Sequence, residues 1–401
     1  MELHTFMNLP RFNAKAGKLL RKTDTFGKEI MEYDSFSPNE LPDMKEFCSD
    51  LSLIEMSNEA NRAIGELHGL INNIGMIGSL KLFIEPYLRK EAVDSSEIEG
   101  TKVSLTDVFL SEAGNKKPEI LNPHVKEVVN FVRAIDYALL ELKNGNKISK
   151  ELINKVHQIL LEGVRGQNKK IGDYRKQQNW VEGNDVLDAR YVPPSEKEVE
   201  RLMQYLFEYI NQEEGYMRLI KAGLIHYYFE TIHPYEDGNG RVGRTLILLY
   251  LIQAKILNEP ILHLSPYFKR YKENYYNLLM NTRETGDYNR WIKFFLTGLT
   301  EVAINTSNKV RKLVRLYDSY RKRLIDSKAT AISFKLLDKF FERPYSYITL
   351  LQEELKEDYP KTKRGLNYLL KCHIIQLYTR QKRNKIYLAP EILKTLEEDL
   401  I

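Results

Sequence analysis

The sequence predicts a mainly α-helical protein, and two observations carry that prediction. Apolar residues recur at helical spacing through most of the chain up to about residue 310, as in segments 51–72, 80–99 and 291–304. Strand-like alternation is confined to one segment within residues 170–194 and to two short runs near the C-terminus. We therefore expect a helical core with one exposed hairpin and a small mixed module at its end.

Length and composition limit what the protein can do. The chain has 401 residues, enough for two or three domains, and its net charge of +5 is too small over this length to predict general nucleic-acid binding. Cys48 and Cys372 are its only cysteines, which excludes a disulfide framework or a zinc cluster and is consistent with a reducing cytoplasm. The chain opens without a basic-then-apolar secretory pattern, and no apolar run approaches the ~20 residues that span a bilayer. We expect a soluble, cytoplasmic protein with no membrane partner.

The chain divides into three predicted regions. The first, residues 1–105, begins with an extended stretch punctuated by prolines and continues with the first two helices. The second, residues 106–310, is helical apart from the hairpin segment, with polar breaks at 115–118 and 144–147. The third, residues 329–401, combines short helices with short strands.

Residues 233–244 read HPYEDGNGRVGR and carry most of the chemistry of the second region. The apolar segments before and after them, 222–232 and 245–252, both predict buried helices. At the start of the second helix, free backbone N–H groups and the positive end of the helix dipole form an anion site. Gly238 and Gly240 let the backbone turn tightly there and approach a phosphate.

The charged residues of this segment suit nucleotide chemistry. Arg241 and Arg244, three positions apart at the helix start, lie on one face and can fork onto phosphate oxygens. Asp237 is a hard oxygen ligand of the kind that magnesium combines with substrate phosphates. His233 is the natural proton acceptor at neutral pH. The sequence therefore predicts a nucleotide-phosphate site with a base beside it.

The same string resembles the signature of the Fic (Fido) family, HPFx[D/E]GNGRxxR, with Tyr235 in place of the common Phe. Fic enzymes typically transfer AMP from ATP to a protein hydroxyl. The resemblance implies that His233 deprotonates the target Ser, Thr or Tyr, and that Asp237 holds Mg²⁺ against the α- and β-phosphates. It also implies that the backbone amides of Gly238, Asn239 and Gly240 form an anion hole. Arg241 would bind the β-phosphate and Arg244 the γ-phosphate.

A second resemblance lies in residues 95–100, SSEIEG, which match the inhibitory motif of the family, [S/T]xxxE[G/N], at Ser95, Glu99 and Gly100. Ser95 and Glu99 are four positions apart and share one face of a helix, and Gly100 suits a helix C-terminus. In relatives with this motif before the core, the glutamate pairs with the second arginine of the signature. The resemblance therefore implies that Glu99 pairs with Arg244, withdraws it from the γ-phosphate and keeps the enzyme autoinhibited.

A third resemblance, within residues 172–194, is to the Fic flap, a β-hairpin that covers the active site and docks the target by strand addition. The residues expected to dock the target are Gln178, Asn179, Trp180 and Val181. Their alternation suits an exposed hairpin, and an exposed strand edge is a ready surface for an extended peptide. An ordinary loop with a buried Trp180 is the alternative.

Two further residues carry weaker signals. Tyr271 falls on a helix that lines the adenine pocket in Fic proteins, so the resemblance implies a contact with the base, with core packing as the alternative. His226 lies seven residues before His233 on the apolar side of the same helix, and we expect a hydrogen-bonded core histidine there. The remaining histidines show no metal-ligand spacing.

The third region predicts helices at 334–341, 348–355 and 360–372, then strands at 374–379 and 385–388. This order resembles a winged helix, a module that reads DNA with its third helix. Cations on that helix and on the turn between the strands could neutralise phosphates. These cations are Lys361, Lys363, Arg364, Lys371, Lys382, Arg383 and Lys385. A protein-contact domain with a solvated basic face is the alternative.

We therefore expect a mainly α, Fic-fold protein adenylyltransferase with a β-hairpin flap, an internal inhibitory helix and a C-terminal winged-helix module. Its substrate is ATP with Mg²⁺, and its target is an unidentified protein hydroxyl, self-modification included. Two alternatives stay open: removal of AMP by the same site, and a DNA-binding regulator whose Fic core senses a nucleotide. A homodimer that locks the inhibitory helix is a further alternative without a marker in the sequence.

Overall fold

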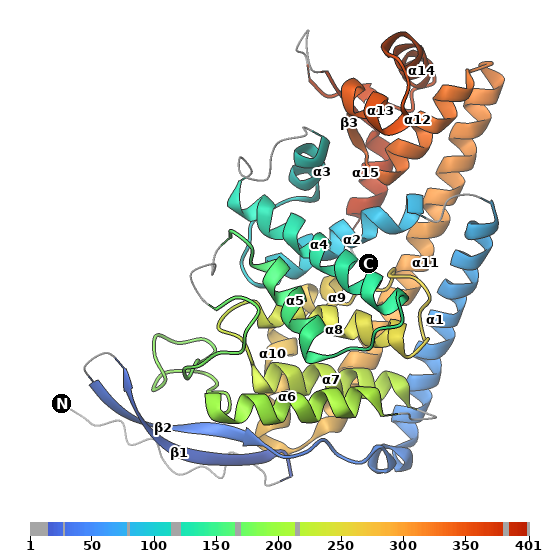
Figure 1. Ribbon diagram of the computed structural model, residues 1–401. Coiled ribbons are helices and arrows are strands. Elements are labelled where there is room, and N and C mark those ends of the chain that lie inside the picture. The colour runs from blue at the N-terminus through green and yellow to red at the C-terminus, as the bar shows by residue number, and fades with distance from the viewer. Residues whose placement is uncertain are drawn as a thin grey trace.

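The computed structural model describes residues 15–26, 29–77, 81–113, 122–164, 170–212, 217–379 and 385–398. Within these ranges the protein is mostly helical and has two small antiparallel sheets, so the prediction of a mainly α protein is confirmed (Figure 1). Within the same ranges, no helix is both long enough and apolar enough to cross a membrane.

Two central helices carry the functional segment. α7 (Arg218–Ile232) and α8 (Asn239–Gln253) are buried along nearly their whole length. A helix that is apolar almost all round has to be surrounded by other elements. The surrounding helices are α2 (Lys81–Ile98), α4 (Pro123–Lys143), α5 (Lys150–Leu160), α6 (Glu196–Asn211) and α11 (Tyr288–Asp326). The turn between α7 and α8 is therefore anchored at both ends in the core.

Two long helices run side by side along one edge of the molecule. α1 (Leu51–Ile77) packs against α11, which spans 39 residues and carries the chain into the C-terminal unit (Figure 1). The apolar pattern at 291–304 predicted only the first part of α11. Its later turns alternate buried residues with exposed charged ones, so their apolar content is lower.

Short elements complete the core: η1 (Met44–Ser49), α3 (Leu105–Ala113), α9 (Ser265–Arg270) and α10 (Lys272–Thr285). The polar break predicted at 144–147 lies between α4 and α5, where Gly145 has a φ of 90° that a side chain would strain. The break predicted at 115–118 lies outside the described residues.

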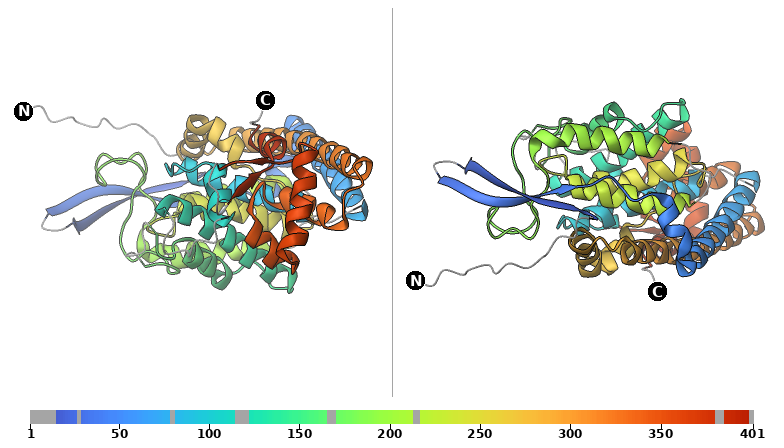
Figure 2. Two further views of the ribbon diagram at one scale, coloured as in Figure 1. Left: turned by 90° about the horizontal axis from the view of Figure 1, so that it is seen from above. Right: turned by 90° about the horizontal axis from the view of Figure 1, so that it is seen from below.

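An N-terminal β-hairpin, which the sequence pattern did not predict, extends outward from this core (Figure 2). β1 (Gly17–Phe26) and β2 (Glu29–Pro38) pair antiparallel along their whole described length. The hairpin packs on the flap segment, where the amide of Phe36 donates to the carbonyl of Val192 (3.0 Å). The proline-punctuated stretch expected to be simply extended is thus a paired strand and the connection that follows it.

The C-terminal unit contains the helices and strands that the sequence predicted there. They are α12 (Ala331–Glu342), α13 (Ile348–Leu355), α14 (Tyr359–Lys371), β4 (Gln376–Leu377) and β5 (Ile386–Leu388). Two elements are additional: β3 (Tyr345–Tyr347) and α15 (Pro390–Glu397). The strands form an antiparallel sheet in the order β3-β5-β4. The winged-helix assignment and the boundaries of the three regions stay predictions, and the basic turn with Lys382 and Arg383 lies outside the described residues.

Candidate active site

His233 follows α7 in a left-handed conformation (φ 49°, ψ 60°), which a non-glycine residue keeps only where its surroundings hold it. Its N–H donates to the carbonyl of Phe229 (3.0 Å), and its own carbonyl accepts from Nε of Arg175 (2.9 Å). The buried guanidinium of Arg175 also donates to the carbonyls of Pro194 (2.5 Å) and Ile232 (3.3 Å). Arg175 therefore stabilises the chain reversal that orients the imidazole.

The electrostatic surroundings of His233 keep it neutral. Burial, together with the charges of Arg175 and Arg283, lowers the pKa of His233 to about 3. The imidazole is therefore unprotonated at neutral pH and able to accept a proton. Its Nδ1 atom lies 3.9 Å from Oε2 of Glu230, and burial raises the pKa of Glu230 to about 7.

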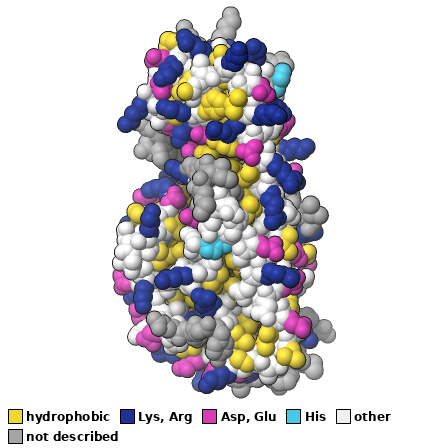
Figure 3. Space-filling model, turned by 90° about the vertical axis from the view of Figure 1, so that its right-hand side faces the viewer, with side chains coloured by type: hydrophobic (Ala, Val, Ile, Leu, Met, Phe, Trp, Pro, Cys, Tyr) yellow, Lys and Arg dark blue, Asp and Glu magenta, His cyan; other side chains and the backbone are white. Residues whose placement is uncertain are grey.

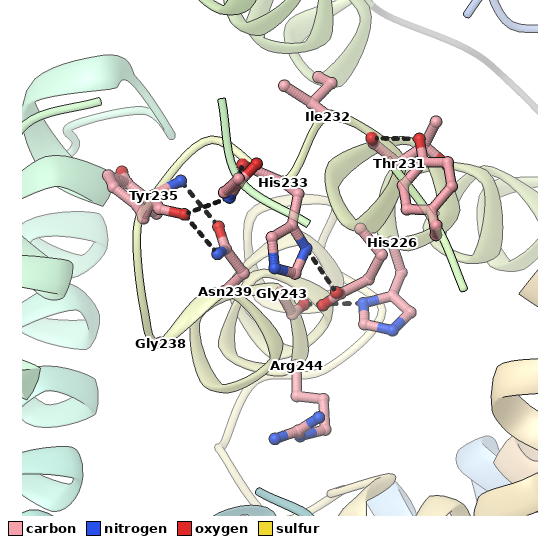
Figure 4. Close-up of polar contacts among 12 residues, drawn as sticks. His226, Thr231, Ile232, His233, Tyr235, Gly238, Asn239, Gly243 and Arg244 are labelled. Carbon is pink, nitrogen blue, oxygen red and sulfur yellow. Dashed lines mark hydrogen bonds and ion pairs between the residues drawn. The ribbon is translucent and has the colours of Figure 1, made fainter. Parts of the chain in front are cut away.

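The turn after His233 is held by side-chain hydrogen bonds. Asn239 accepts from the amide of Tyr235 (2.9 Å) and donates to its carbonyl (2.8 Å), as Figure 4 shows. The buried ring of Tyr235 stacks on His157 at 3.8 Å between centroids. Its hydroxyl donates to Oδ1 of Asn154 (2.7 Å), which explains how a tyrosine is accommodated in place of the common Phe.

The backbone N–H groups at the start of a helix such as α8 can bind an anion. Gly238 takes a φ of 79° just before the helix, and its amide donates to Oδ1 of Asp237 (2.6 Å). A Cβ atom at position 240 would lie only 2.1 Å from Oε1 of Glu99. Gly240 is thus required for the close approach of that carboxylate, which stands against the helix start.

Asp237 and Arg241 lie together beside these amides. Oδ1 of Asp237, whose side chain is 25% exposed, is 3.6 Å from Nη2 of buried Arg241, and Nη1 of Arg241 is 3.7 Å from Oε2 of Glu127. The described ranges contain no group of three or more His, Cys, Asp or Glu side chains able to hold a metal ion. A single carboxylate beside the start of a helix is compatible with magnesium, which binds one or two carboxylates plus substrate phosphates. Metal binding at Asp237 stays a prediction.

Arg244 is engaged by the end of α2. Its Nη2 atom lies 2.8 Å from Oε1 of Glu99, and Nε and Nη2 donate to the hydroxyl (2.8 Å) and carbonyl (2.9 Å) of Ser95. Burial favours the protonated form of Glu99, but the guanidinium of Arg244 outweighs it and holds the pKa of Glu99 below its ordinary value. Gly100 follows with a φ of 86°, as expected where a helix ends.

A cleft of about 940 Å³, open to solvent, joins most of these groups. Its lining includes Glu99, His233, Gly240 and Arg244. The flap and α10 form the other side with Trp180, Val181, Tyr275, Tyr276 and Arg283. Asp237, Gly238, Asn239 and Arg241 do not line the cleft itself but adjoin it at the start of α8.

The flap is an irregular hairpin whose two arms are not joined by a continuous ladder of backbone hydrogen bonds. Val181 and Tyr191 pair in one antiparallel bridge. Gln178 donates to the carbonyl of Pro193 (3.0 Å) and Asn179 to that of Tyr235 (3.0 Å), so side chains brace this segment. Trp180 is half-buried and packs edge-on against Phe26 of β1 at 6.1 Å. Target docking by this segment stays a prediction.

Tyr271 lies apart from the cleft. It stands between α9 and α10, where its ring packs against Tyr267 at 4.9 Å. Its contact with a nucleotide base therefore stays a prediction, and the tyrosines that line the cleft are Tyr191, Tyr275 and Tyr276. His226 is a buried core histidine, as expected: Nε2 bonds the hydroxyl of Tyr275 (2.8 Å) and Nδ1 faces the carbonyl of Gly243 (3.1 Å).

Glu230 and Arg283 belong to the site, although the sequence pattern did not reveal them. Glu230 is a charged residue inside an apolar helical run, a signal that could have identified it. Arg283 is buried, donates to the carbonyl of Glu230 (3.1 Å) and stacks on Tyr191 of the flap at 3.8 Å. No local pattern marks Arg283, because its partners come from α7 and the flap.

Comparison with known families agrees with this geometry. Residues 54–140 match the family model described as Fic/DOC family N-terminal, and residues 147–251 match that of the Fic/DOC family. A probable protein adenylyltransferase of Aquifex aeolicus (strain VF5) is 28% identical over 199 residues, which are 48% of this chain and 57% of the relative. The protein adenylyltransferase Fic of Aedes aegypti is 27% identical over 174 residues, 42% of this chain and 31% of the relative. The chain thus spans little more than half of one relative and under a third of the other.

One solved structure resembles the protein over most of its length. A Fic family protein from Desulfovibrio desulfuricans G20 superposes with a TM-score of 0.53 at 21% sequence identity. The superposition covers 84% of this chain and 95% of the other. This likeness concerns the fold.

Proposed function

Because the chain is a Fic domain protein, we propose that it is a protein adenylyltransferase, which transfers AMP from ATP to a Ser, Thr or Tyr hydroxyl of a protein. Relatives that match part of the chain carry that name. The observation that carries the proposal is the neutral imidazole of His233 beside the start of α8 and two buried arginines. A base, an anion site and cations are the parts that such a transfer needs.

In the proposed reaction the phosphates of ATP bind at the start of α8, where Arg241 and Arg244 neutralise their charge. His233 accepts the proton of the target hydroxyl at Nε2, and the hydroxyl oxygen forms a bond to the α-phosphorus. The bond from the α-phosphorus to its bridging oxygen breaks, and the electron pair leaves with pyrophosphate. A magnesium ion bound through Asp237 would supply further positive charge against the phosphates.

Glu99 restrains this reaction in our proposal. Glu99 and Ser95 together engage two nitrogens of Arg244, which is then turned away from the γ-phosphate. The carboxylate of Glu99 also stands against Gly240, where it repels an incoming phosphate at short range. ATP would therefore bind in an unproductive pose until Glu99 moves.

The protein target would add to the flap as an extended segment along residues 178–181. Gln178 and Asn179 are braced by hydrogen bonds to backbone carbonyls, so the edge is held in place before the target arrives. Strand addition of this kind gains affinity from main-chain hydrogen bonds and tolerates many sequences. Self-modification is included, because any segment of a second molecule that reaches the flap could serve as target.

Intact-mass spectrometry tests the proposal. Wild type, Glu99→Gly and the Glu99→Gly/His233→Ala double variant are each incubated with ATP and magnesium, and their masses are measured. In a second assay, each protein is incubated with labelled ATP and a cell lysate that supplies possible targets. We expect a gain of AMP in Glu99→Gly, less in wild type and none in the double variant. Equal labelling of wild type and Glu99→Gly would contradict the restraint by Glu99. No labelling in any sample would contradict AMP transfer and favour AMP removal by the same site.

A second candidate function is DNA binding by the C-terminal unit. It is favoured by the exposed face of α14, which includes Arg364 and Lys371, and Figure 3 shows many Lys and Arg side chains on this unit among acidic ones. However, Lys361 pairs with Glu357 (2.6 Å) and Lys363 donates to the hydroxyl of Tyr387 (3.1 Å). Salt-sensitive retention on DNA that persists in His233→Ala and disappears in the Arg364→Ala/Lys371→Ala variant would support this function.

A further inference from the structure

Glu230 is a buried acidic residue in the last turn of α7 that the proposed mechanism does not use. It is 7% exposed, and it contributes to the lining of the cleft. Its Oε2 atom lies 3.9 Å from Nδ1 of His233. Oε1 of Glu230 is buried without a hydrogen-bond partner among the described residues, and Nδ1 of His233 is buried with no well-formed hydrogen bond there, although the backbone of Glu230 also favours the protonated imidazole. Buried polar groups usually have partners, so two such groups beside each other mark an interaction that is only partly formed.

Gly243 of α8 provides the space for this carboxyl group. A Cβ atom at position 243 would lie 2.3 Å from Oε1 of Glu230, so a larger residue there would displace the carboxyl group. The imidazole is correspondingly oriented: Nδ1 is buried, whereas 20% of the His233 side chain is exposed. The exposed edge is therefore the one that carries Nε2, and the ring presents Nε2 to the cleft and Nδ1 to Glu230.

Charged and titratable groups face Glu230 from several elements. His233 follows α7, Glu99 follows α2 and Arg244 lies on α8. The other three lie on α10: Tyr275, Tyr276 and Arg283. Burial raises the pKa of Glu230 to about 7, although the two arginines oppose the rise. The carboxyl group can therefore change its charge near neutral pH, at the pH where the transfer would operate.

We propose that Glu230 is a positioning residue for His233: its carboxylate receives the Nδ1–H, keeps Nε2 directed at the target hydroxyl and stabilises the imidazolium that forms. This inference rests on the proposed AMP transfer. The hydroxyl proton passes to Nε2 and stays on the ring, so Glu230 balances the new charge without taking a proton. The two groups must approach by about 1 Å to reach hydrogen-bond distance, and catalytic hydrogen bonds often tighten only when substrate binds.

The pH dependence of transfer tests this role. Glu230→Gln and Glu230→Asp are each made in the Glu99→Gly protein, and kcat and KM for ATP are measured from about pH 5.5 to about pH 9. Only ionised Glu230 can pair with the imidazolium, so the rate of Glu99→Gly should rise with pH as Glu230 ionises. The charge of Glu99 helps to raise the pKa of Glu230 to about 7, so in this variant the rise should come at a lower pH. Glu230→Gln should lose this rise and have a kcat roughly 100-fold lower, with little change in KM. Glu230→Asp keeps a carboxylate and should therefore recover part of the rise with pH and part of kcat.

Glu91→Gln in the Glu99→Gly protein is a matched control. Glu91 is a buried carboxyl group on α2 with a pKa that burial raises to about 8, but it bonds to Ser265 and not to His233. Its loss should leave the rise with pH in place. A Glu230→Gln protein that keeps the rate and the rise would overturn the inference, as would an equal effect of Glu91→Gln. If Glu230→Gln does not fold, the pH profile of kcat for Glu230→Asp is used instead, and a profile identical to that of Glu99→Gly would overturn the inference. Absence of AMP transfer in Glu99→Gly itself would instead refute the proposed function.

Discussion

Nη2 of Arg244 lies 2.8 Å from Oε1 of Glu99, although the two residues are 145 positions apart in the chain. Ser95 adds two hydrogen bonds to the same guanidinium, so the end of α2 holds two of its nitrogens. The third, Nη1, is buried without a hydrogen-bond partner among the described residues. An arginine near the start of α8 is therefore bound by an internal carboxylate and by Ser95.

Replacing Ser95 by Ala should release Arg244 in part. The variant loses the hydrogen bond from Nε to the hydroxyl but keeps the Glu99 pair and the bond to the backbone carbonyl. A hydrogen bond to a charged group contributes about 1.5–3 kcal/mol, so the basal rate should rise by roughly 10-fold or more, less than in Glu99→Gly. Transfer of label from ATP measures the rise.

Ser96→Ala is the matched control for that experiment. Ser96 is buried on the same turn, but its hydroxyl has no hydrogen-bond partner among the described residues and does not reach Arg244. Its removal should leave the basal rate unchanged. Equal rates for Ser95→Ala and wild type, or equal increases for both alanine variants, would show that the hydroxyl of Ser95 does not hold Arg244 in its restrained position.

Much of the candidate site was predictable because its parts are local in sequence. His233, the two glycines and the two arginines lie within one turn and the helix start that follows, so their chemistry could be inferred from spacing. The helical class was predictable for a similar reason, since apolar periodicity marks α7 and α8 directly. The Glu99–Arg244 pair needed the family resemblance, because no pattern in the sequence relates residues 145 positions apart.

Other parts could not be predicted because non-local packing determines them. The β1–β2 hairpin is covered on both faces only near residues 35–38, and most of β1 is exposed or half-buried, so its strands lack the apolar content of a core strand. Ile30 is even 75% exposed. Arg283 likewise gains its role from α7 and from Tyr191 of the flap, neither of which is near it in sequence. Alternating patterns predict strands only where one face is buried against a core.

Glu91→Gln should stabilise the protein at alkaline pH. Burial raises the pKa of Glu91 above its ordinary value of 4.5 to about 8, so its protonated form contributes stability that is full below about pH 4.5 and lost as the pH rises through 8. Glutamine imitates the protonated form and can still accept from Ser265. Thermal unfolding should show a higher Tm for the variant at pH 8.5 and nearly equal values at pH 5. A constant difference across this range would contradict the raised pKa.

Tyr235→Phe should cost about 1 kcal/mol of stability, although phenylalanine is the common residue in the family signature. The change removes the hydroxyl that donates to Asn154 (2.7 Å) and leaves that amide without its partner. A second substitution, Asn154→Leu, removes the stranded amide, so the double variant should regain stability over Tyr235→Phe. Urea unfolding of the four proteins in this cycle measures the coupling. Additive effects of the two changes would mean that the hydrogen bond contributes little.

Arg175→Lys should lower kcat while leaving the affinity for ATP nearly unchanged. Lysine keeps the positive charge but not the planar fork that binds the carbonyls of His233, Ile232 and Pro194 together. His233 would then lose its fixed position after α7, and a displacement of about 1 Å can cost roughly 100-fold in rate. The α8 amides and Arg244 do not depend on Arg175, so ATP titration calorimetry on the Glu99→Gly background should give a similar Kd. Lys176→Arg, at the exposed neighbouring position, is the control. If Arg175→Lys weakened ATP binding as much as it slowed transfer, Arg175 would be supporting the whole cleft and not the base alone.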